Sequence, residues 1–141
     1  MSLEDLYQDL ILDHGTKPRN FVDLPVYTHH AEGFNPLCGD KVELKLVVNT
    51  QDQTIEAACF QGSGCAIAVA SGSLMTEYLK GKSLKEAQIF FESFQAWLLG
   101  QADQKEADKF GKLEALAGVK QFPARVKCAT LAWHAFLQAI K

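Results

Sequence analysis

The spacing of apolar residues predicts a helix at the start of the chain and a strand further on. Apolar side chains recur at helical spacing on one face of the first segment: Leu3, Leu6, Tyr7, Leu10 and Ile11. Gly15 and Pro18 are expected to end this helix. Over residues 41–48 the period changes to two, with apolar residues at every even position and charged residues at 41, 43 and 45. This alternation predicts a strand with one buried face.

A second strand is predicted directly after the first. Residues 49–53 have the sequence Asn-Thr-Gln-Asp-Gln, which indicates a polar turn, and residues 54–61 form the next candidate strand. Because the connection is short, the two strands are expected to pair as an antiparallel hairpin. Another short strand is expected over residues 26–31, after an irregular stretch that begins at residue 21.

Three further helices are predicted in the second half of the chain. The first covers residues 66–80, with Ser63 as its candidate N-cap. Ser83 and Glu86 form a capping box at the start of the second helix. Pro123 suits the first position of the third helix, because proline lacks the N–H that would be unpaired there.

The stretch between the last two predicted helices changes character along its length. Residues 100–111 are polar and charged, which predicts an exposed segment with a short helix. Leu113, Leu116 and Val119 then predict a short, partly buried turn. The chain has no internal repeat, and its 141 residues fit a single domain over 1–141 that buries roughly two-thirds of its unfolded surface.

Composition and charge exclude several classes of function. The net charge is −3, and basic and acidic residues are mixed along the chain without a basic stripe, which argues against nucleic acid as the main partner. No apolar run approaches the roughly 20 residues that a membrane-spanning helix needs. The acidic start at residues 1–5 lacks the features of a secretory signal. We therefore expect a cytoplasmic protein with no membrane partner.

The cysteines carry the candidate chemistry. There are four, and in a cytosolic chain metal binding or catalysis is favoured over disulfides. Cys38 and Asp40 lie in the loop Asn-Pro-Leu-Cys-Gly-Asp at residues 35–40, where proline and glycine constrain the backbone and keep the carboxylate near the sulfur. Cys65 lies at a helix start, which favours thiolate, and Cys128 lies in the first turns of the last helix. Three sulfurs and one oxygen would form a tetrahedral zinc site or an open cradle for iron and sulfide.

Two residues near these candidates have less specific patterns. Cys59 lies in the predicted strand over 54–61, on the same face as Ala57 and Ile55, and we expect it to pack as a small apolar residue outside the site. Arg125 lies three residues before Cys128, on the same side of the helix. Its guanidinium either stabilises a thiolate or persulfide or is a solvated cation, and the sequence leaves both open.

The histidines do not define a site. His14 is expected to be a solvated cation at the end of the first helix, where the helix dipole favours positive charge, rather than a ligand. His29 and His30 are adjacent, so on a strand they would point to opposite faces and could not both reach one metal. Their roles are left open by the sequence.

Three cysteine-containing motifs follow one another along the chain. They are the loop at 35–40, Gly-Ser-Gly-Cys at 62–65 followed by Ala70 and Ser71, and Arg-Val-Lys-Cys-Ala-Thr-Leu at 125–131. Together with the polar loop at 14–20, they resemble the IscU/NifU-N family of iron–sulfur cluster assembly proteins over nearly the whole chain.

Two features make the chain more similar to the SufU branch of that family. The stretch from Cys65 to Cys128 is long, with what resembles the insertion of that branch around residues 100–122, and Lys127 stands where the IscU branch has histidine. Residues 122–127 also depart from the Leu-Pro-Pro-Val-Lys segment that IscU proteins present to their dedicated chaperone. Chaperone-assisted release is therefore not implied for this chain.

The resemblance implies a fold, a ligand set and partners. The fold would be α+β, SufE/IscU-like, with a three-stranded antiparallel sheet packed against helices and the metal at one exposed end. The ligands would be Cys38, Asp40, Cys65 and Cys128. The partners would be a SufS-like cysteine desulfurase, together with apo iron–sulfur proteins or other assembly components.

Two functions share this implied site. One is a zinc-dependent sulfurtransferase that accepts persulfide sulfur, with Cys38 as the acceptor because it lies on a loop, and Cys128, near Arg125, as second choice. The other is a non-enzymatic scaffold on which a transient [2Fe–2S] cluster, held by Cys38, Cys65 and Cys128, is assembled and passed to apo-proteins. A purely structural zinc site fits less well because one ligand is a carboxylate. A zinc hydrolase ranks last, since four protein ligands leave no open position for water.

Overall fold

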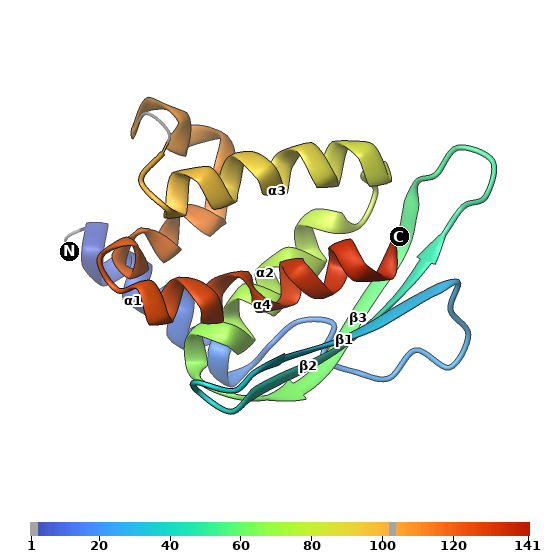
Figure 1. Ribbon diagram of the computed structural model, residues 1–141, viewed down its shortest axis with the longest axis horizontal. Helices are drawn as coiled ribbons and strands as arrows, with labels where there is room; N and C mark the ends of the chain where they lie inside the picture. Colours follow the sequence, from blue (N-terminus) through green and yellow to red (C-terminus); the bar gives the residue numbers. More distant parts are fainter. Residues whose placement is uncertain (1–2, 102–103) are drawn as a thin grey trace.

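The computed structural model describes residues 3–101 and 104–141. Its elements in chain order are α1 (Leu3–Thr16), β1 (His29–Asn35), β2 (Asp40–Val48), β3 (Ile55–Ser63), α2 (Ala66–Leu79), α3 (Leu84–Leu98), the 3₁₀ segment η1 (Gln104–Gln121) and α4 (Pro123–Ala139). The strands form one antiparallel sheet in the order β1-β2-β3, and the helices gather on one side of it (Figure 1). This arrangement confirms the predicted α+β class.

No helix among the described residues combines the length and apolar character needed to cross a membrane.

The central strand β2 follows the predicted alternation. Its apolar residues at positions 42, 44, 46 and 48 are all buried, whereas the residues between them are exposed or half-buried. Both hairpin partners are antiparallel to it, as the short 49–53 connection predicted for β3. The buried face of the sheet therefore supplies one wall of the hydrophobic core.

The strand predicted over 26–31 lies further along the chain. Strand β1 runs from His29 to Asn35, and its pairing with β2 continues until Asn35 faces Asp40. The strand was placed too early because Gly33 has no apolar side chain and so interrupts the alternating pattern. A Cβ at Gly33 would come within 3.1 Å of Leu131 on α4. The close approach of Val42 and Leu131 thus favours glycine at this position, and glycine adds nothing to the apolar pattern.

Cys59 lies on the opposite face of β3 from the one predicted. Its neighbours Ala58 and Phe60 point into the core, and Cys59 is half-buried on the outer face beside Lys45. A bulge opposite Val47 and Val48 shifts the register, so that Ile55 is nevertheless buried. Strict alternation from Ile55 therefore assigned Cys59 to the wrong face.

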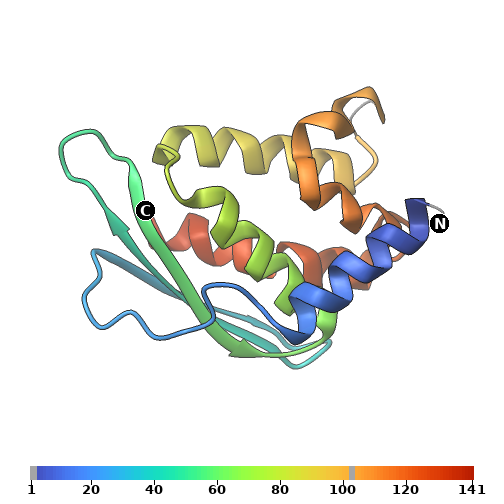
Figure 2. The same ribbon diagram turned by 180° about the vertical axis from the view of Figure 1, so that it is seen from behind.

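The helices form two layers above the sheet. Helices α2 and α4 pack against the strands, and α3 and η1 lie further out (Figures 1 and 2). The layers meet in an aromatic cluster where Trp133 of α4 stacks on Phe91 of α3, with ring centroids 5.3 Å apart and an interplanar angle of 7°. Phe110 of η1 joins it edge-on to Phe90 and Phe94.

From Phe110 onward, the η1 segment is more buried than its sequence indicated. It is helical on both sides of Gly111, where the backbone leaves helical angles. Phe110, together with Leu113, Leu116 and Val119, is buried against the helices. The burial of Phe110 was missed because it stands in a polar stretch and takes its place only from the aromatic cluster that surrounds it.

Helix α1 departs from expectation at its end and at His14. It continues through Gly15 to Thr16. His14 is fully buried rather than solvated, and its Nδ1 shares a 2.6 Å hydrogen bond with Ser73 Oγ of α2. Burial lowers the pKa of His14, so the ring is neutral at pH 7 and bridges two helices instead of capping one.

The packing of α2 on the sheet makes a prediction about Gly72. A Cβ at this position would lie 2.8 Å from the ring of Phe60, so Gly72→Ala must either displace this core ring or push α2 away from β3. We expect the free energy of unfolding to fall by about 1–3 kcal/mol, measured by denaturant titration. Gly118→Ala is the matched control, because nothing lies within 4 Å of its Cβ, and it should show no loss. Equal losses in both variants would contradict the close packing of α2.

Candidate metal centre

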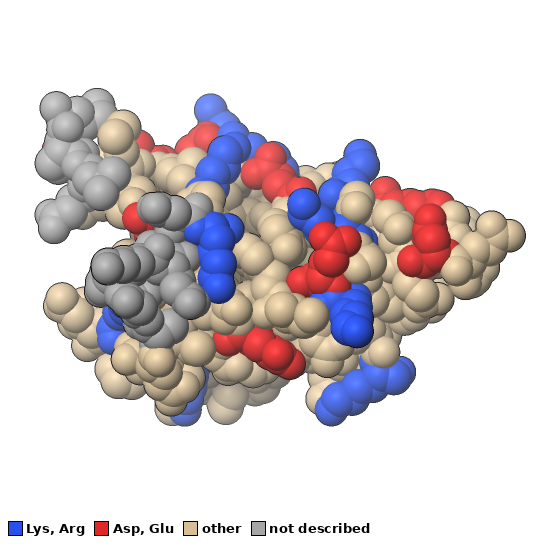
Figure 3. Space-filling model, turned by 90° about the horizontal axis from the view of Figure 1, so that it is seen from above, with Lys and Arg blue, Asp and Glu red and all other residues tan. Residues whose placement is uncertain are grey.

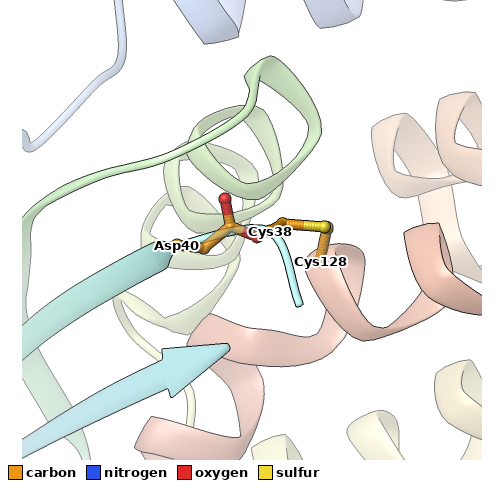
Figure 4. A group of neighbouring side chains, drawn as sticks. All are labelled: Cys38, Asp40 and Cys128. Carbon is orange, nitrogen blue, oxygen red and sulfur yellow. The ribbon is translucent and has the colours of Figure 1, made fainter. Parts of the chain in front are cut away.

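Three segments far apart in sequence meet at one end of the sheet. The turn at 36–39 joins β1 to β2 and carries Cys38, and its Gly39 has a positive φ of 70°. Asp40 is the first residue of β2, and Cys128 lies in the second turn of α4. Figure 4 shows the Cys38 and Cys128 side chains meeting, with Asp40 beside them.

The ligand atoms of these three residues are close enough to share one metal ion. The thiol sulfurs of Cys38 and Cys128 and a carboxylate oxygen of Asp40 all lie within 4.8 Å of one another. The two sulfurs are 3.4 Å apart. Tetrahedral zinc with bonds of about 2.3 Å would separate two sulfurs by roughly 3.8 Å. The arrangement therefore fits zinc, or the iron of a cluster, after a small adjustment.

Cys65 reaches the site chiefly through its backbone. It is the N-cap of α2, a place that Ser63 was predicted to take, and its N–H donates a 2.8 Å hydrogen bond to Asp40 Oδ1. Its thiol lies outside the group of three ligand atoms, but it interacts with the thiol of Cys128. The structure thus places Cys65 at the edge of the same site.

Gly64 makes this contact between Asp40 and the start of α2 possible. A Cβ at Gly64 would overlap the Asp40 carboxylate, with Asp40 Cγ only 2.9 Å away. This steric constraint explains why the Gly-Ser-Gly-Cys motif has glycine directly before the cysteine. Its second glycine lets the backbone pass close enough for the Cys65 N–H to bond the carboxylate.

The candidate ligands differ sharply in exposure. Asp40 is 0% exposed and Cys128 is 1% exposed, whereas Cys38 is exposed on its turn. Burial raises the pKa of the Cys128 thiol well above its usual range, and hydrogen bonding with Asp40 and the neighbouring thiols adds to this. Without metal Cys128 is therefore a neutral thiol at pH 7, with its Sγ 3.4 Å from Cys38 Sγ and 3.6 Å from the Ala124 carbonyl oxygen.

Asn35 belongs to this site although the sequence analysis gave it no role. Its side chain is 5% exposed, and its Nδ2 lies 3.4 Å from Asp40 Oδ2 and 3.7 Å from Cys128 Sγ. Its Oδ1 accepts the Leu37 N–H at 3.3 Å, which is an Asx-turn. The pattern Asn-Pro at the start of the cysteine loop was the signal that could have revealed this turn.

The other residues considered from the sequence lie away from the three ligand atoms. Arg125 is exposed at the start of α4, and its guanidinium lies over the ring of Phe122 at 4.9 Å. His30 lies on the outer face of β1, with Nε2 3.5 Å from Glu43. In the described part of the chain, no histidine joins the thiol group. Both interpretations of Arg125 stay open.

Comparison with known proteins agrees with this fold. The model of the NifU-like N-terminal domain matches residues 6–140, so the chain belongs to that family. It is 37% identical to the zinc-dependent sulfurtransferase SufU of Bacillus subtilis over 142 residues, covering 99% of this chain and 92% of that protein. It is 38% identical to the iron–sulfur cluster assembly scaffold protein IscU of Streptococcus pyogenes over 139 residues, covering 99% and 85%.

A solved structure extends the likeness to three dimensions. A putative iron–sulfur cluster assembly scaffold protein for the SUF system from Fervidobacterium islandicum superposes with a TM-score of 0.87 at 28% identity. The superposition covers 99% of this chain and 100% of that one. The resemblance to the IscU/NifU-N family and the fold that it implied are thus confirmed.

The difference in exposure predicts the order in which the thiols react. In folded, chelator-treated protein, iodoacetamide should modify Cys38 at least about tenfold faster than Cys128, because Cys128 is buried and its pKa is raised. Raising the pH through 8 to 9 should leave the modification of Cys128 slow, since its raised pKa keeps that thiol protonated over this range. A time course of peptide mass spectra measures both rates. Equal rates in the folded protein would contradict the geometry.

Proposed function

We propose that this protein accepts persulfide sulfur from a cysteine desulfurase at a zinc site, as a step in iron–sulfur cluster assembly. The ligands are Cys38, Asp40, Cys65 and Cys128. The observation that carries the proposal is the convergence of Cys38, Asp40 and Cys128, with one thiol exposed and two ligands buried. The relative named a zinc-dependent sulfurtransferase, matched over 99% of this chain, supports the choice of metal and reaction.

The donor set suits zinc without leaving an open position. Thiolates are the softer ligands that zinc binds in tetrahedral sites, and one carboxylate completes four ligands. Bound zinc would keep the thiols ionised at neutral pH. The buried pair of Asp40 and Cys128 gives the site a fixed wall, and the exposed Cys38 closes it from the solvent side.

In this proposal the reacting atom is the sulfur of Cys38. The Cys38 thiolate attacks the outer sulfur of the donor's cysteine persulfide, the donor's S–S bond breaks, and the donor cysteine leaves as a thiolate. One sulfur atom moves, Cys38 becomes a persulfide, and no electron is gained or lost overall. Cys38 is suited to this step because it lies on an exposed turn. Cys128 is held inside α4 and Cys65 at the start of α2.

Arg125 is our candidate for stabilising the transferred charge. It lies exposed at the N-terminal end of α4, held by its stacking on Phe122, and can approach a partner or a persulfide from the solvent side.

On the face shown in Figure 3, basic and acidic side chains are interspersed. Because the charges are mixed, we propose a protein partner rather than nucleic acid. We also propose a cytoplasmic setting, in which the thiols stay reduced.

A [2Fe–2S] scaffold is the second candidate function. The relative named as a scaffold, IscU of Streptococcus pyogenes, is as similar to this chain as the sulfurtransferase is. The same three thiols could hold cluster iron, and the cluster would then pass to apo-proteins. Metal and sulfide analysis of anaerobically purified protein separates the two functions, because only a scaffold carries iron and acid-labile sulfide.

The zinc site makes a prediction about the four cysteines. Serine at position 38, 65 or 128 should weaken zinc retention more than about a hundredfold, beyond the effect of residues outside the coordination shell. Each variant should also lose the thermal stabilisation that zinc gives the parent. Cys59→Ser is the control, because Cys59 lies on the outer face of β3, and it should bind zinc normally. Competition with a chromophoric chelator measures this, and equal loss in the control would refute the ligand set.

Sulfur transfer makes a prediction about Cys38. After incubation with a cysteine desulfurase and cysteine, non-reducing peptide mass spectrometry should find a persulfide on Cys38 of the zinc-loaded protein. The exposed thiol can meet the donor sulfur, whereas the buried one cannot. Cys38→Ser should abolish the modification and Cys59→Ser should not. A persulfide appearing first on Cys128, with Cys38 unmodified, would reject this assignment.

A further inference from the structure

We propose that Asn35 is a positioning residue that raises the affinity of the site for zinc by holding Asp40 and Cys128 in their ligating arrangement. The inference rests on the proposed zinc site and adds a residue outside the four ligands. It starts from the contacts of one buried amide. Asn35 Nδ2 donates to Asp40 Oδ2 at 3.4 Å and toward Cys128 Sγ at 3.7 Å.

The charge of the site explains why such a donor matters. Three thiolates and a carboxylate would carry four negative charges against the two positive charges of zinc. In the described part of the chain, no Lys, Arg or His nitrogen lies within 4.0 Å of the Asp40 carboxylate. The excess charge must then be stabilised by N–H dipoles, because buried anions are costly without hydrogen bonds.

Two N–H donors meet this need at Asp40, one on each oxygen. The Cys65 N–H donates to Oδ1 at 2.8 Å, and the Asn35 amide donates to Oδ2. The same amide nitrogen also faces the sulfur of Cys128. Asn35 therefore contacts two candidate ligands from different elements, the start of β2 and the second turn of α4.

The backbone holds Asn35 in place for this role. It is the last residue of β1 and pairs with Asp40 across the hairpin, and Pro36 keeps it extended. Its Oδ1 accepts the Leu37 N–H at 3.3 Å, which orients the amide so that its nitrogen faces the ligands. The same side chain thus links the turn that carries Cys38 to the buried wall of the site.

The proposed role of Asn35 depends on the hydrogen-bonding groups of its amide and not only on its shape. Leucine has nearly the same shape but neither donates nor accepts a hydrogen bond. Outer residues that orient metal ligands typically contribute 10- to 100-fold to metal affinity, so Asn35→Leu should weaken zinc binding by about 10- to 100-fold. A residue that served only packing would lower stability without changing the geometry of the ligands.

The experiment compares Asn35→Leu with the matched variant Thr130→Val. Thr130 is also buried, on α4, and its Oγ1 bonds the Val126 carbonyl at 2.9 Å instead of a ligand. Zinc dissociation constants are measured by chelator competition, and thermal unfolding is measured on the metal-free proteins. Co²⁺ substitution adds a readout of geometry, because sulfur-to-cobalt charge-transfer absorption reports thiolate coordination.

We expect Asn35→Leu to bind zinc about 10- to 100-fold more weakly and to shift the Co²⁺ spectrum, with Thr130→Val unchanged in both. Unchanged affinity and spectrum in Asn35→Leu would overturn the assignment, as would equal losses in both variants. If Asn35→Leu does not fold, Asn35→Ala gives the same comparison, and failure of both to fold would show a structural role instead. Failure of the unaltered protein to bind zinc through its thiols would overturn the proposed function itself.

Discussion

The geometry of this protein's functional end depends on one buried carboxylate, that of Asp40. It starts the central strand, accepts the N–H of Cys65 and so ties the sheet to the first turn of α2. Burying a carboxylate is unfavourable unless donors or a cation compensate for the lost water. Gly64 allows the approach of the donor, and the amide of Asn35 meets the other oxygen. A metal ion would complete this compensation.

Around this carboxylate, the fold gives each thiol a different degree of freedom. Cys128 comes from α4, a helix packed on both the sheet and α2 within the core. Cys65 stands at a helix start, and Cys38 projects from the four-residue turn between β1 and β2. Groups held by regular elements suit binding, whereas an exposed group on a turn suits reaction with a second protein. The arrangement therefore suits the proposed function, in which the buried ligands would hold the metal and the exposed Cys38 would receive sulfur.

Membership of the NifU-like N-terminal domain family does not by itself decide between sulfur transfer and cluster scaffolding. Relatives bearing each name match this chain with nearly equal identity over almost its full length. Both chemistries need thiolates gathered at an exposed end of the sheet. The difference lies in what the thiolates hold, because zinc leaves Cys38 as a single nucleophile whereas a cluster engages the sulfurs together.

The sequence by itself determined the central hairpin through its apolar periodicity and the family through the order of its cysteine motifs, because both are local properties of the chain. The α+β class was implied by the resemblance to that family. It placed Asp40, Cys38 and Cys128 as candidates that the structure brings together. Only the tertiary structure decided the place of β1, the face of Cys59 and the burial of His14. The place of β1 depends on α4 over Gly33 and the burial of His14 depends on Ser73 of α2, both distant in sequence. The face of Cys59 follows from a bulge in β3 itself, which forms where this strand pairs with Val47 and Val48. The contacts of Asn35 could not be predicted from the sequence either, because its partners Asp40 and Cys128 come from two other elements.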